Sequence, residues 1–270
     1  MNVRAIRAII RKDLLVVLQS KAVLLPIIIV PLVMLLVLPV LASFAPYLIN
    51  VPGASDLTGM LERMPEAFQA RFAGLTDEQT IVTLLLVYLF APMYLIVPLM
   101  VASVIAADAF AGEKERRTLE ALLYTPTTDT ELLVGKLLVG FVPAMAVAWG
   151  GFLLYTVVAN VAGWSVMGYL FFPTPMWWVL AFWVAPAVAA VGLGATVLVS
   201  ARVNTFQEAY QIGGVVVLPI VLLVVGQAAG VVVLSTAVVA ALGAVFWAVA
   251  AGLLAFGARR FRRGELLARS

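Results

Sequence analysis

Residues 112–126 read GEKERRTLEALLYTP, and six of the eight residues from Glu113 to Glu120 are charged. The chain as a whole is 64% hydrophobic and only 11% charged, so this segment differs sharply from its surroundings. Carboxylate and guanidinium groups at a protein interface form hydrogen-bonded ion pairs that fix the register of two partners. A segment this polar between two long apolar runs must emerge into water on one side of a membrane, and its role depends on what it contacts there.

Catalytic and metal-binding chemistry has little to work with in this sequence. There is no cysteine and no histidine, which excludes disulfides, thiolate or imidazole metal ligands, and Cys/His or Ser/His catalytic pairs. The sequence also has no GxSxG elbow, no HExxH pair and no GxxxxGK[ST] loop for nucleotide phosphates. We expect no catalytic residue, no metal site and no cofactor in this chain.

The elements that must position the charged segment are membrane helices. A mean hydropathy of +1.11 leaves too little polar surface for a soluble protein of 270 residues. A bilayer core of roughly 30 Å needs about 20 apolar residues per helix, and several such runs occur. Residues 212–256 carry no charge over 45 residues, which is too long for one span but enough for two with a reversal near GQAAG at 226–230.

The sequence therefore predicts an all-α membrane protein with six spans, forming a single transmembrane domain over residues 1–270. An interfacial helix is expected at 1–20, an external segment at 45–79 and a cytoplasmic segment at 108–135. The expected spans are residues 22–44, 80–107, 137–161, 177–200, 212–226 and 232–256.

Orientation follows from the lysine and arginine residues, because short loops rich in them stay in the cytoplasm. With six spans, every basic residue except Arg63 and Arg71 falls on the side of the two termini. We therefore expect both termini in the cytoplasm of a multi-pass protein. The same bias explains the basic pI without nucleic acid, because a polybasic tail more often contacts anionic lipid.

Local sequence patterns predict helix boundaries. Thr128 with Glu131 and Thr76 with Gln79 form capping boxes that could start the third and second spans. Leu119, Leu122 and Leu123 share one side of a short amphipathic helix that Pro126 would end. This helix is either a solvated loop helix that only satisfies topology or a docking element.

The first 20 residues form an amphipathic pattern of their own. An apolar stripe lies opposite four basic residues, as in a helix that lies in the membrane interface. The four are Arg4, Arg7, Arg11 and Lys12. With no small-residue cleavage pattern, we expect this segment to be retained, either as a simple anchor or as an elbow beside the first span.

Three patches resemble one protein family. AGEKERRTLEALLYTP followed by ELLVGKLL is similar to the cytoplasmic segment of permease subunits of type 2 ATP-binding-cassette exporters. SARVNTFQEAYQIGGVVVLP at 200–219 resembles the loop before their fifth span, and IIRKDLLVVLQSKAVLLP resembles their opening elbow. The subgroup that it resembles most is the sodium-exporter-like permeases.

The resemblance implies a permease that pairs with a second copy or a relative, and with two separate ATP-binding subunits. ATP and Mg²⁺ would then bind in the partner, and the membrane would be the inner membrane of a prokaryote. The coupling residues that it implies are Glu113, Lys114, Arg116, Arg117, Leu119, Glu120, Leu122 and Leu123. The residues implied in the second cytoplasmic loop are Arg202, Asn204, Gln207 and Glu208.

Two other classes of function remain open at this stage. A membrane-embedded enzyme would need a catalytic constellation, which the sequence does not offer. A non-transporting assembly or sensor subunit partnered with an ATPase would share the whole layout. The predicted spans carry no ionisable residue away from their ends, which favours an ATP-driven exporter over an ion-driven carrier.

Overall fold

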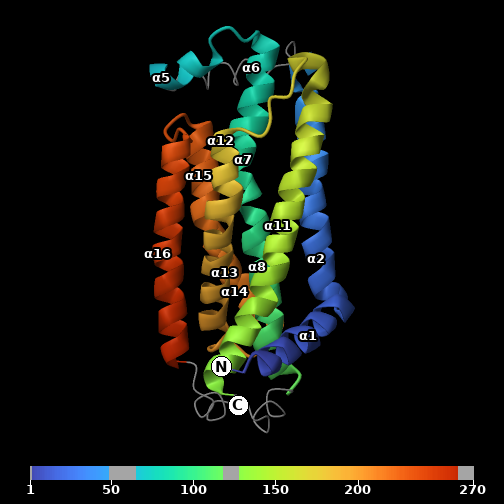
Figure 1. Cartoon of the computed structure of the whole chain (residues 1–270), viewed down its shortest axis with the longest axis vertical. Coiled ribbons are helices and arrows are strands. Elements are labelled where there is room, and N and C mark those ends of the chain that lie inside the picture. The colour runs from blue at the N-terminus through green and yellow to red at the C-terminus, as the bar shows by residue number, and fades with distance from the viewer. Residues whose placement is uncertain (1, 49–64, 118–127, 261–270) are drawn as a thin grey trace.

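A computed structural model describes residues 2–48, 65–117 and 128–260 of the chain (Figure 1). The structure is 86% helical, has no strand in those ranges, and contains six helices that are long and apolar enough to cross a membrane. The expectation of an all-α membrane protein with six spans is thus confirmed. In order, the six spans are Lys21–Tyr47, Asp77–Glu115, Asp129–Met167, Pro175–Ser200, Phe206–Ala228 and Thr236–Ala258.

Helix α1 (Val3–Gln19) precedes the first half of the bundle and crosses its lower end in Figure 1. The first span consists of α2 (Lys21–Leu32), η1 (Val33–Val37), α3 (Leu38–Ser43) and η2 (Ala45–Leu48). Two short elements follow, α5 (Glu66–Gln69) and η3 (Ala70–Phe72). The second span consists of α6 (Asp77–Thr83), η4 (Leu84–Leu89), α7 (Phe90–Tyr94), α8 (Ile96–Ala107), η5 (Asp108–Gly112) and α9 (Glu113–Glu115).

The second half begins with a single continuous helix, α11 (Asp129–Met167), which is the third span. The fourth span consists of α12 (Pro175–Val179), η6 (Leu180–Val184) and α13 (Ala185–Ser200). The fifth consists of α14 (Phe206–Gly213), η7 (Gly214–Val217) and α15 (Leu218–Ala228), and the sixth is α16 (Thr236–Arg260). Gly230, with φ 74°, lies in the reversal between α15 and α16.

The second and third spans are the longest, with 39 residues each. At 1.5 Å per residue each is about 58 Å long, roughly twice the thickness of a bilayer core. They contain the expected spans 80–107 and 137–161 and continue beyond them at the end where α1 lies (Figure 1). We call this end of the molecule the basic end, because the N-terminal arginines and the 201–205 loop lie there.

Both expected capping boxes are confirmed at the starts of the long spans. The Thr76 and Thr128 side chains accept from the backbone N–H of Gln79 and Glu131, whose side chains in turn accept from the backbone N–H of the threonines. Each box pairs two N–H groups that a helix start would leave without partners. The sequence thus sets where these helices begin.

The second and fourth spans form the centre of the bundle. In each, 72% of the most apolar 18-residue stretch is buried inside the protein, against 17% of the same stretch in the fifth and sixth spans. The two central spans approach closely at Gly192, where a Cβ would lie 2.8 Å from Ser103 Oγ and 3.0 Å from the Leu99 carbonyl oxygen. Only glycine fits there, because the Leu99 carbonyl oxygen is a backbone atom and cannot move aside as the end of a side chain could.

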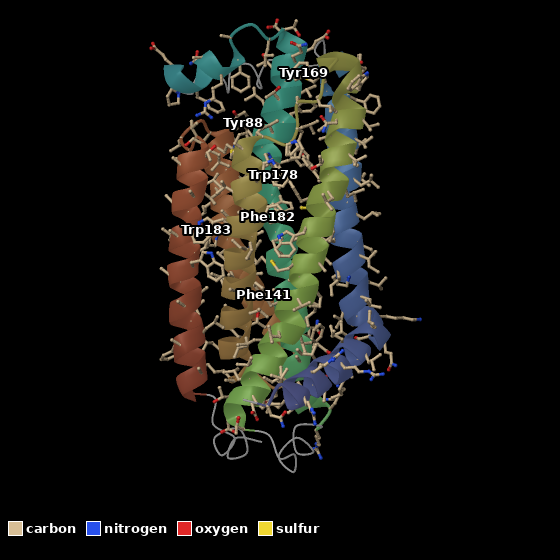
Figure 2. The ribbon with its side chains drawn as sticks, viewed as in Figure 1. Tyr88, Phe141, Tyr169, Trp178, Phe182 and Trp183 are labelled. Atoms are coloured by element: carbon tan, nitrogen blue, oxygen red, sulfur yellow. The ribbon has the colours of Figure 1, made fainter. Side chains whose placement is uncertain are left out.

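Figure 2 shows Trp178, Phe182 and Trp183 along the fourth span, and each of these side chains is about half exposed.

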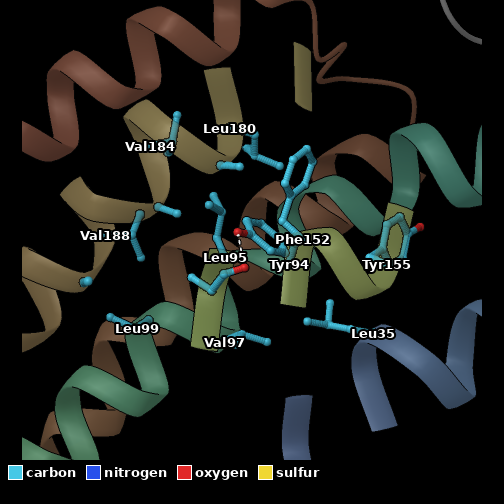
Figure 3. Packing of buried hydrophobic residues seen from close by; sticks show 14 of the residues in the cluster. Leu35, Tyr94, Leu95, Val97, Leu99, Phe152, Tyr155, Leu180, Val184 and Val188 are labelled. Atoms are coloured by element: carbon cyan, nitrogen blue, oxygen red, sulfur yellow. Dashed lines mark hydrogen bonds between the residues drawn. The ribbon is translucent and has the colours of Figure 1, made fainter. Parts of the chain in front are cut away.

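Aromatic rings fill the centre between the second, third and fourth spans. Tyr155 and Trp177 are fully buried and stack at 4.9 Å between ring centroids, and Phe172 meets both rings edge-on. Tyr94 donates a hydrogen bond to the Ala148 carbonyl oxygen over 2.9 Å. Figure 3 shows Tyr94 and Tyr155 among the surrounding aliphatic side chains.

Two prolines explain why these aromatic donors lie where they do. Pro92 has no N–H, so the carbonyl of Val87 five residues earlier, in the π-helical segment η4, cannot receive a bond from it. The Trp177 indole N–H donates to that carbonyl over 2.7 Å, and the Tyr155 hydroxyl donates to the adjacent Leu86 carbonyl over 2.6 Å. Both carbonyls of the π-helical segment are thereby paired across spans.

The fourth span repeats the arrangement. Pro186 follows the π-helical segment η6 and leaves the carbonyl of Ala181, five residues earlier, without its N–H. The Trp149 indole N–H of the third span donates to this carbonyl over 3.0 Å. In a membrane, an unpaired backbone group costs several kcal/mol, so the bends demand partners from neighbouring helices. These bonds join the second, third and fourth spans into one unit.

At the opposite end, short polar and aromatic elements close the bundle. Phe68 and Phe72 are buried against Leu84 and Tyr88 of the second span. Residues 49–64, which belong to the expected external segment, lie outside the described residues. Asn160 fixes the connector after α11: its Oδ1 accepts from the backbone N–H of Phe171 and Phe172.

The hydrogen bonds from the Trp177 and Trp149 indoles to backbone carbonyl oxygens, which we call the indole caps, can be tested by substitution. Replacing Trp177 with Phe keeps an aromatic ring but leaves the Val87 carbonyl buried and unpaired, which costs roughly 1–3 kcal/mol. We expect a loss of that size in the free energy of unfolding, measured by denaturant titration in detergent micelles. The control is Trp178→Phe, because Trp178 is 50% exposed, and its loss should stay within about 0.5 kcal/mol. Equal losses in the two variants would contradict the cap.

Candidate functional site

The charged segment at 113–117 begins at the end of the second span, and its first residue faces inward. Glu113 is 4% exposed. Its carboxylate lies 2.7 Å from Lys12 Nζ of α1 and 2.5 Å from Lys136 Nζ of α11. One carboxylate thus joins three segments that are far apart in the sequence.

Lys136 is the most deeply buried charge of this site, with 0% exposure. Besides Glu113, its ammonium group donates to the Ala109 carbonyl oxygen and lies 5.3 Å from the centre of the Phe110 ring. Ala109 and Phe110 belong to η5, a π-helical segment. Carboxylate, carbonyl and ring face together surround the ammonium group with negative or partly negative atoms.

Two further acids complete the group. Asp13 lies 3.0 Å from Lys12, and Asp108 lies 2.9 Å from Arg116. Gly112 lies between the last two side chains, and a Cβ there would come within 2.8 Å of Asp108 Oδ1. We call this set the ionic cluster; it contains three acids and three bases, which are Lys12, Asp13, Asp108, Glu113, Arg116 and Lys136.

These contacts and burial shift the pKa values of Lys12, Arg116 and Asp13. Burial would lower the pKa of Lys12, but the hydrogen bond and charge of Glu113 outweigh burial, and the pKa rises. The hydrogen bond that Arg116 donates to Asp108 raises the pKa of Arg116. Burial raises the pKa of Asp13, against the lowering effect of Lys136 and Lys12. Lys12 and Arg116 therefore stay charged at neutral pH, whereas burial opposes the charge of Asp13.

Helix α1 has a second attachment to α11. The backbone N–H of Asn2 donates to Glu131 Oε1 over 2.5 Å, while Glu131 also caps its own helix through Thr128. Ile9 lies against Gly135, where a Cβ would come within 3.1 Å of Ile9 Cγ2. The N-terminal helix is therefore held along its length against the third span.

The two loops at the basic end are also bonded to each other. Lys114 donates to the Val203 carbonyl oxygen over 3.1 Å, and Glu115 accepts from the Phe206 backbone N–H over 2.9 Å. Ala209 of α14 is buried against the second span, beside the stacked rings of Phe206 and Tyr210. The segment at 113–117 and the loop at 201–208 thus form one surface.

The structure separates the residues that the resemblance implied. Glu113 is buried in the ionic cluster, whereas Arg116 and Arg117 are exposed, and Arg117 has a positive φ of 56°. All four residues of the second loop are exposed, as are the four basic residues of α1. The remaining implied coupling residues lie outside the described residues; these are Leu119, Glu120, Leu122 and Leu123.

Sequence reasoning gave no part in this site to Asp13, Lys136 or Asp108, and position 108 entered only as the start of the expected cytoplasmic segment. One signal was available: Asp13 is the first acidic residue of the chain, and the next is Asp56. An acidic residue on the buried face of an amphipathic helix indicates that a partner for its charge is buried beside it. The pairing of Lys12 and Glu113, 101 positions apart, has no comparable signal in one sequence.

The arrangement suits mechanical connection better than ligand chemistry. Each carboxylate of the ionic cluster faces a lysine or arginine, so the set is balanced in charge. Within residues 2–48, 65–117 and 128–260, no group of three or more potential ligands is placed to hold a metal ion. The pairs join α1, the second span and the third span, so movement of one element acts on the other two.

Comparison with known proteins agrees with this layout. The family model described as ABC-2 family transporter protein matches residues 7–242, which include most of α1, both joined loops and all of the ionic cluster. A comparison with curated proteins gave no significant match.

The ionic cluster makes a stability prediction. Glu113→Gln leaves the Lys136 ammonium group buried without its counter-ion, and breaking a buried pair in this way costs about 3–5 kcal/mol. We expect a loss of this order in the free energy of unfolding in detergent. Glu113→Leu combined with Lys136→Met removes both charges and should recover at least half of the loss.

The matched control is Glu115→Gln, two residues further along. Glu115 is exposed, and a glutamine oxygen can still accept from Phe206, so this variant should lose about 0.5 kcal/mol or less. If Glu113→Gln were as mild as this control, or the double variant no better than the single one, the pair would not be a buried constraint.

Proposed function

The chain belongs to the ABC-2 family of membrane transporter proteins, and from this premise we propose that it is the transmembrane subunit of an ATP-driven exporter. Membership implies partnership with an ATP-binding-cassette subunit. The proposal adds direction: the chain moves a substrate outward when separate ATP-binding subunits close on ATP. It also places the protein, with both termini in the cytoplasm, in the inner membrane of a prokaryote.

The observation that carries the proposal is the joined surface at the basic end. Exposed side chains from two loops lie on it, held together by the bonds of Lys114 and Glu115 to the second loop. A partner that binds one loop therefore binds both. We call these exposed residues the docking face: Arg117, Arg202, Asn204, Gln207 and Glu208.

The ionic cluster connects the docking face to the membrane helices. Segment α9 directly continues the second span, and Glu113 at its start is paired with Lys136 on the third span and Lys12 on α1. The indole and tyrosine bonds extend this unit to the fourth span. Displacement of the docking face by a closing partner would thus move three spans together.

Nucleotide chemistry in this proposal belongs to the partner. The chain has no loop of the GxxxxGK[ST] type, so ATP and Mg²⁺ would bind in the ATP-binding subunit. A second copy of the chain or a relative would complete the pathway. Because the charged side chains of the described spans lie near the span ends, the pathway suits an amphiphilic or peptide-like substrate better than a multiply charged one. Transport of sodium rests on resemblance alone.

ATP hydrolysis and transport can be measured separately. The chain purified alone should hydrolyse no ATP, whereas its complex with an ATP-binding subunit in inside-out vesicles should hydrolyse ATP and accumulate substrate. Hydrolysis by a rigorously pure preparation of the chain alone would refute the assignment. Hydrolysis by the complex without vectorial movement of any tested substrate would favour a sensor or assembly subunit.

The docking face is tested by charge reversal at exposed positions. We expect Arg117→Glu or Arg202→Glu to reduce co-purification of the ATP-binding subunit about tenfold, because a reversed interface charge opposes the partner. Arg71→Glu, at the other end of the molecule, is the control and should leave binding unchanged. Glu113 is avoided because its reversal would also break the ionic cluster. If both docking-face variants bound the ATP-binding subunit as well as the wild type does, the interface would lie on another surface of the protein.

A further inference from the structure

Three arginines of α1 form a ridge that nothing in the described chain neutralises. Arg4, Arg7 and Arg11 are spaced by three and four residues, so at 3.6 residues per turn they lie within an arc of about 60°. All three are exposed, and their guanidinium groups make no ion pair with any described residue. This contrasts with Lys12, the next residue, which is paired twice.

The direction of this ridge is fixed by the opposite face of α1. Ile6, Ile9, Asp13 and Val17 are buried at helical spacing toward the third span. The bonds of Lys12 to Glu113 and of the Asn2 N–H to Glu131 prevent rotation of the helix. The arginines therefore point away from the bundle at all times when α1 is docked.

The same exposed ridge continues into an apolar surface. Leu15 and Leu18 lie within about 40° of Arg11 around the helix and are 51% and 60% exposed. After Ser20 the first span begins, and its outer face is also exposed: Leu25 at 55%, Ile28 at 58% and Leu32 at 47%. Large apolar side chains exposed on a spanning helix contact lipid tails.

This order places the arginines at the level of the lipid headgroups. The ridge runs along α1, a helix of 17 residues or about 25 Å, directly beside the point where the chain enters the bilayer. A water-soluble protein could cover the arginines but not the lipid-facing leucines that continue their ridge. Lipid molecules can cover both, with tails on the leucines and headgroups on the arginines.

We propose that Arg4, Arg7 and Arg11 form a binding site for the phosphate headgroups of anionic membrane lipids. Guanidinium groups bind phosphate oxygens through paired hydrogen bonds, and basic residues at a membrane surface each strengthen attraction to anionic lipid. The bound lipid would hold α1, and with it Lys12 and the ionic cluster, at the membrane surface. The site requires only the membrane-spanning fold and not the proposed transport activity.

The experiment measures lipid binding to the purified chain. Native mass spectrometry counts phosphatidylglycerol and phosphatidylcholine molecules that stay bound, and thermal unfolding reports stabilisation by each lipid. We expect the wild type to retain phosphatidylglycerol in preference to phosphatidylcholine. Arg4→Gln, Arg7→Gln and Arg11→Gln combined should weaken this binding at least tenfold, and raising NaCl from about 0.05 to 0.5 M should weaken it in the wild type.

Controls separate the site from simple charge and from free phosphate. Arg71→Gln, Arg117→Gln and Arg202→Gln combined remove the same charge elsewhere and should bind phosphatidylglycerol like the wild type. Lysine at positions 4, 7 and 11 should restore binding in part. Inorganic phosphate should neither stabilise the protein nor displace the lipid. In phosphatidylcholine alone, the glutamine variant should unfold at the wild-type temperature, because the three side chains are exposed.

Several outcomes would overturn the proposal. Equal retention of the two lipids by the wild type would do so, as would unchanged phosphatidylglycerol binding in the glutamine variant. If free phosphate competed fully, the site would be one for a soluble anion. If the glutamine variant kept its lipid but lost an ATP-binding subunit in lipid-free detergent, the ridge would bind protein.

Discussion

The ammonium group of Lys136, which no solvent reaches, requires negative atoms around it, and the basic end of the molecule is built to supply them. Glu113 provides the charge, the π-helical segment η5 provides the Ala109 carbonyl, and Lys12 balances the second oxygen of Glu113. Because removal of one partner leaves a buried charge, these residues depend on one another. The position of α1 and the register of the second and third spans both follow from that dependence.

The same physical reason governs the centre of the bundle, where the unpaired groups are backbone carbonyls. Val87 and Ala181 each lie in a π-helical segment five residues before a proline, and an indole from another span donates to the carbonyl oxygen of each. The bends therefore have fixed partners, and the three central spans move as one body. The fifth and sixth spans are much less buried. The Trp183 indole N–H of the fourth span donates to the Ala240 carbonyl oxygen of the sixth over 3.1 Å, and the Phe206 N–H of the fifth donates to Glu115 at the end of the second.

Much of the fold could be predicted from sequence because its causes are local. Apolar run length gives the six spans, and the threonine boxes at 76 and 128 set two helix starts. The joined loops, the ionic cluster and the indole caps could not be predicted, because each pairs residues that are remote in sequence, such as Trp177 and Val87. A single sequence shows that Pro92 frees a carbonyl but not which side chain reaches it.

The long sequence distance between Lys12 and Glu113 has a consequence for biosynthesis. Ribosomes make α1 before α11, yet the buried face of α1 rests on α11, and its Lys12 pairs with a carboxylate made 101 residues later. Until the third span has been synthesised, Ile9 has no Gly135 to lie against, and Asp13 has no Lys136 nearby. Helix α1 therefore reaches its final place only after three spans have entered the bilayer, and its docking closes the first stage of assembly.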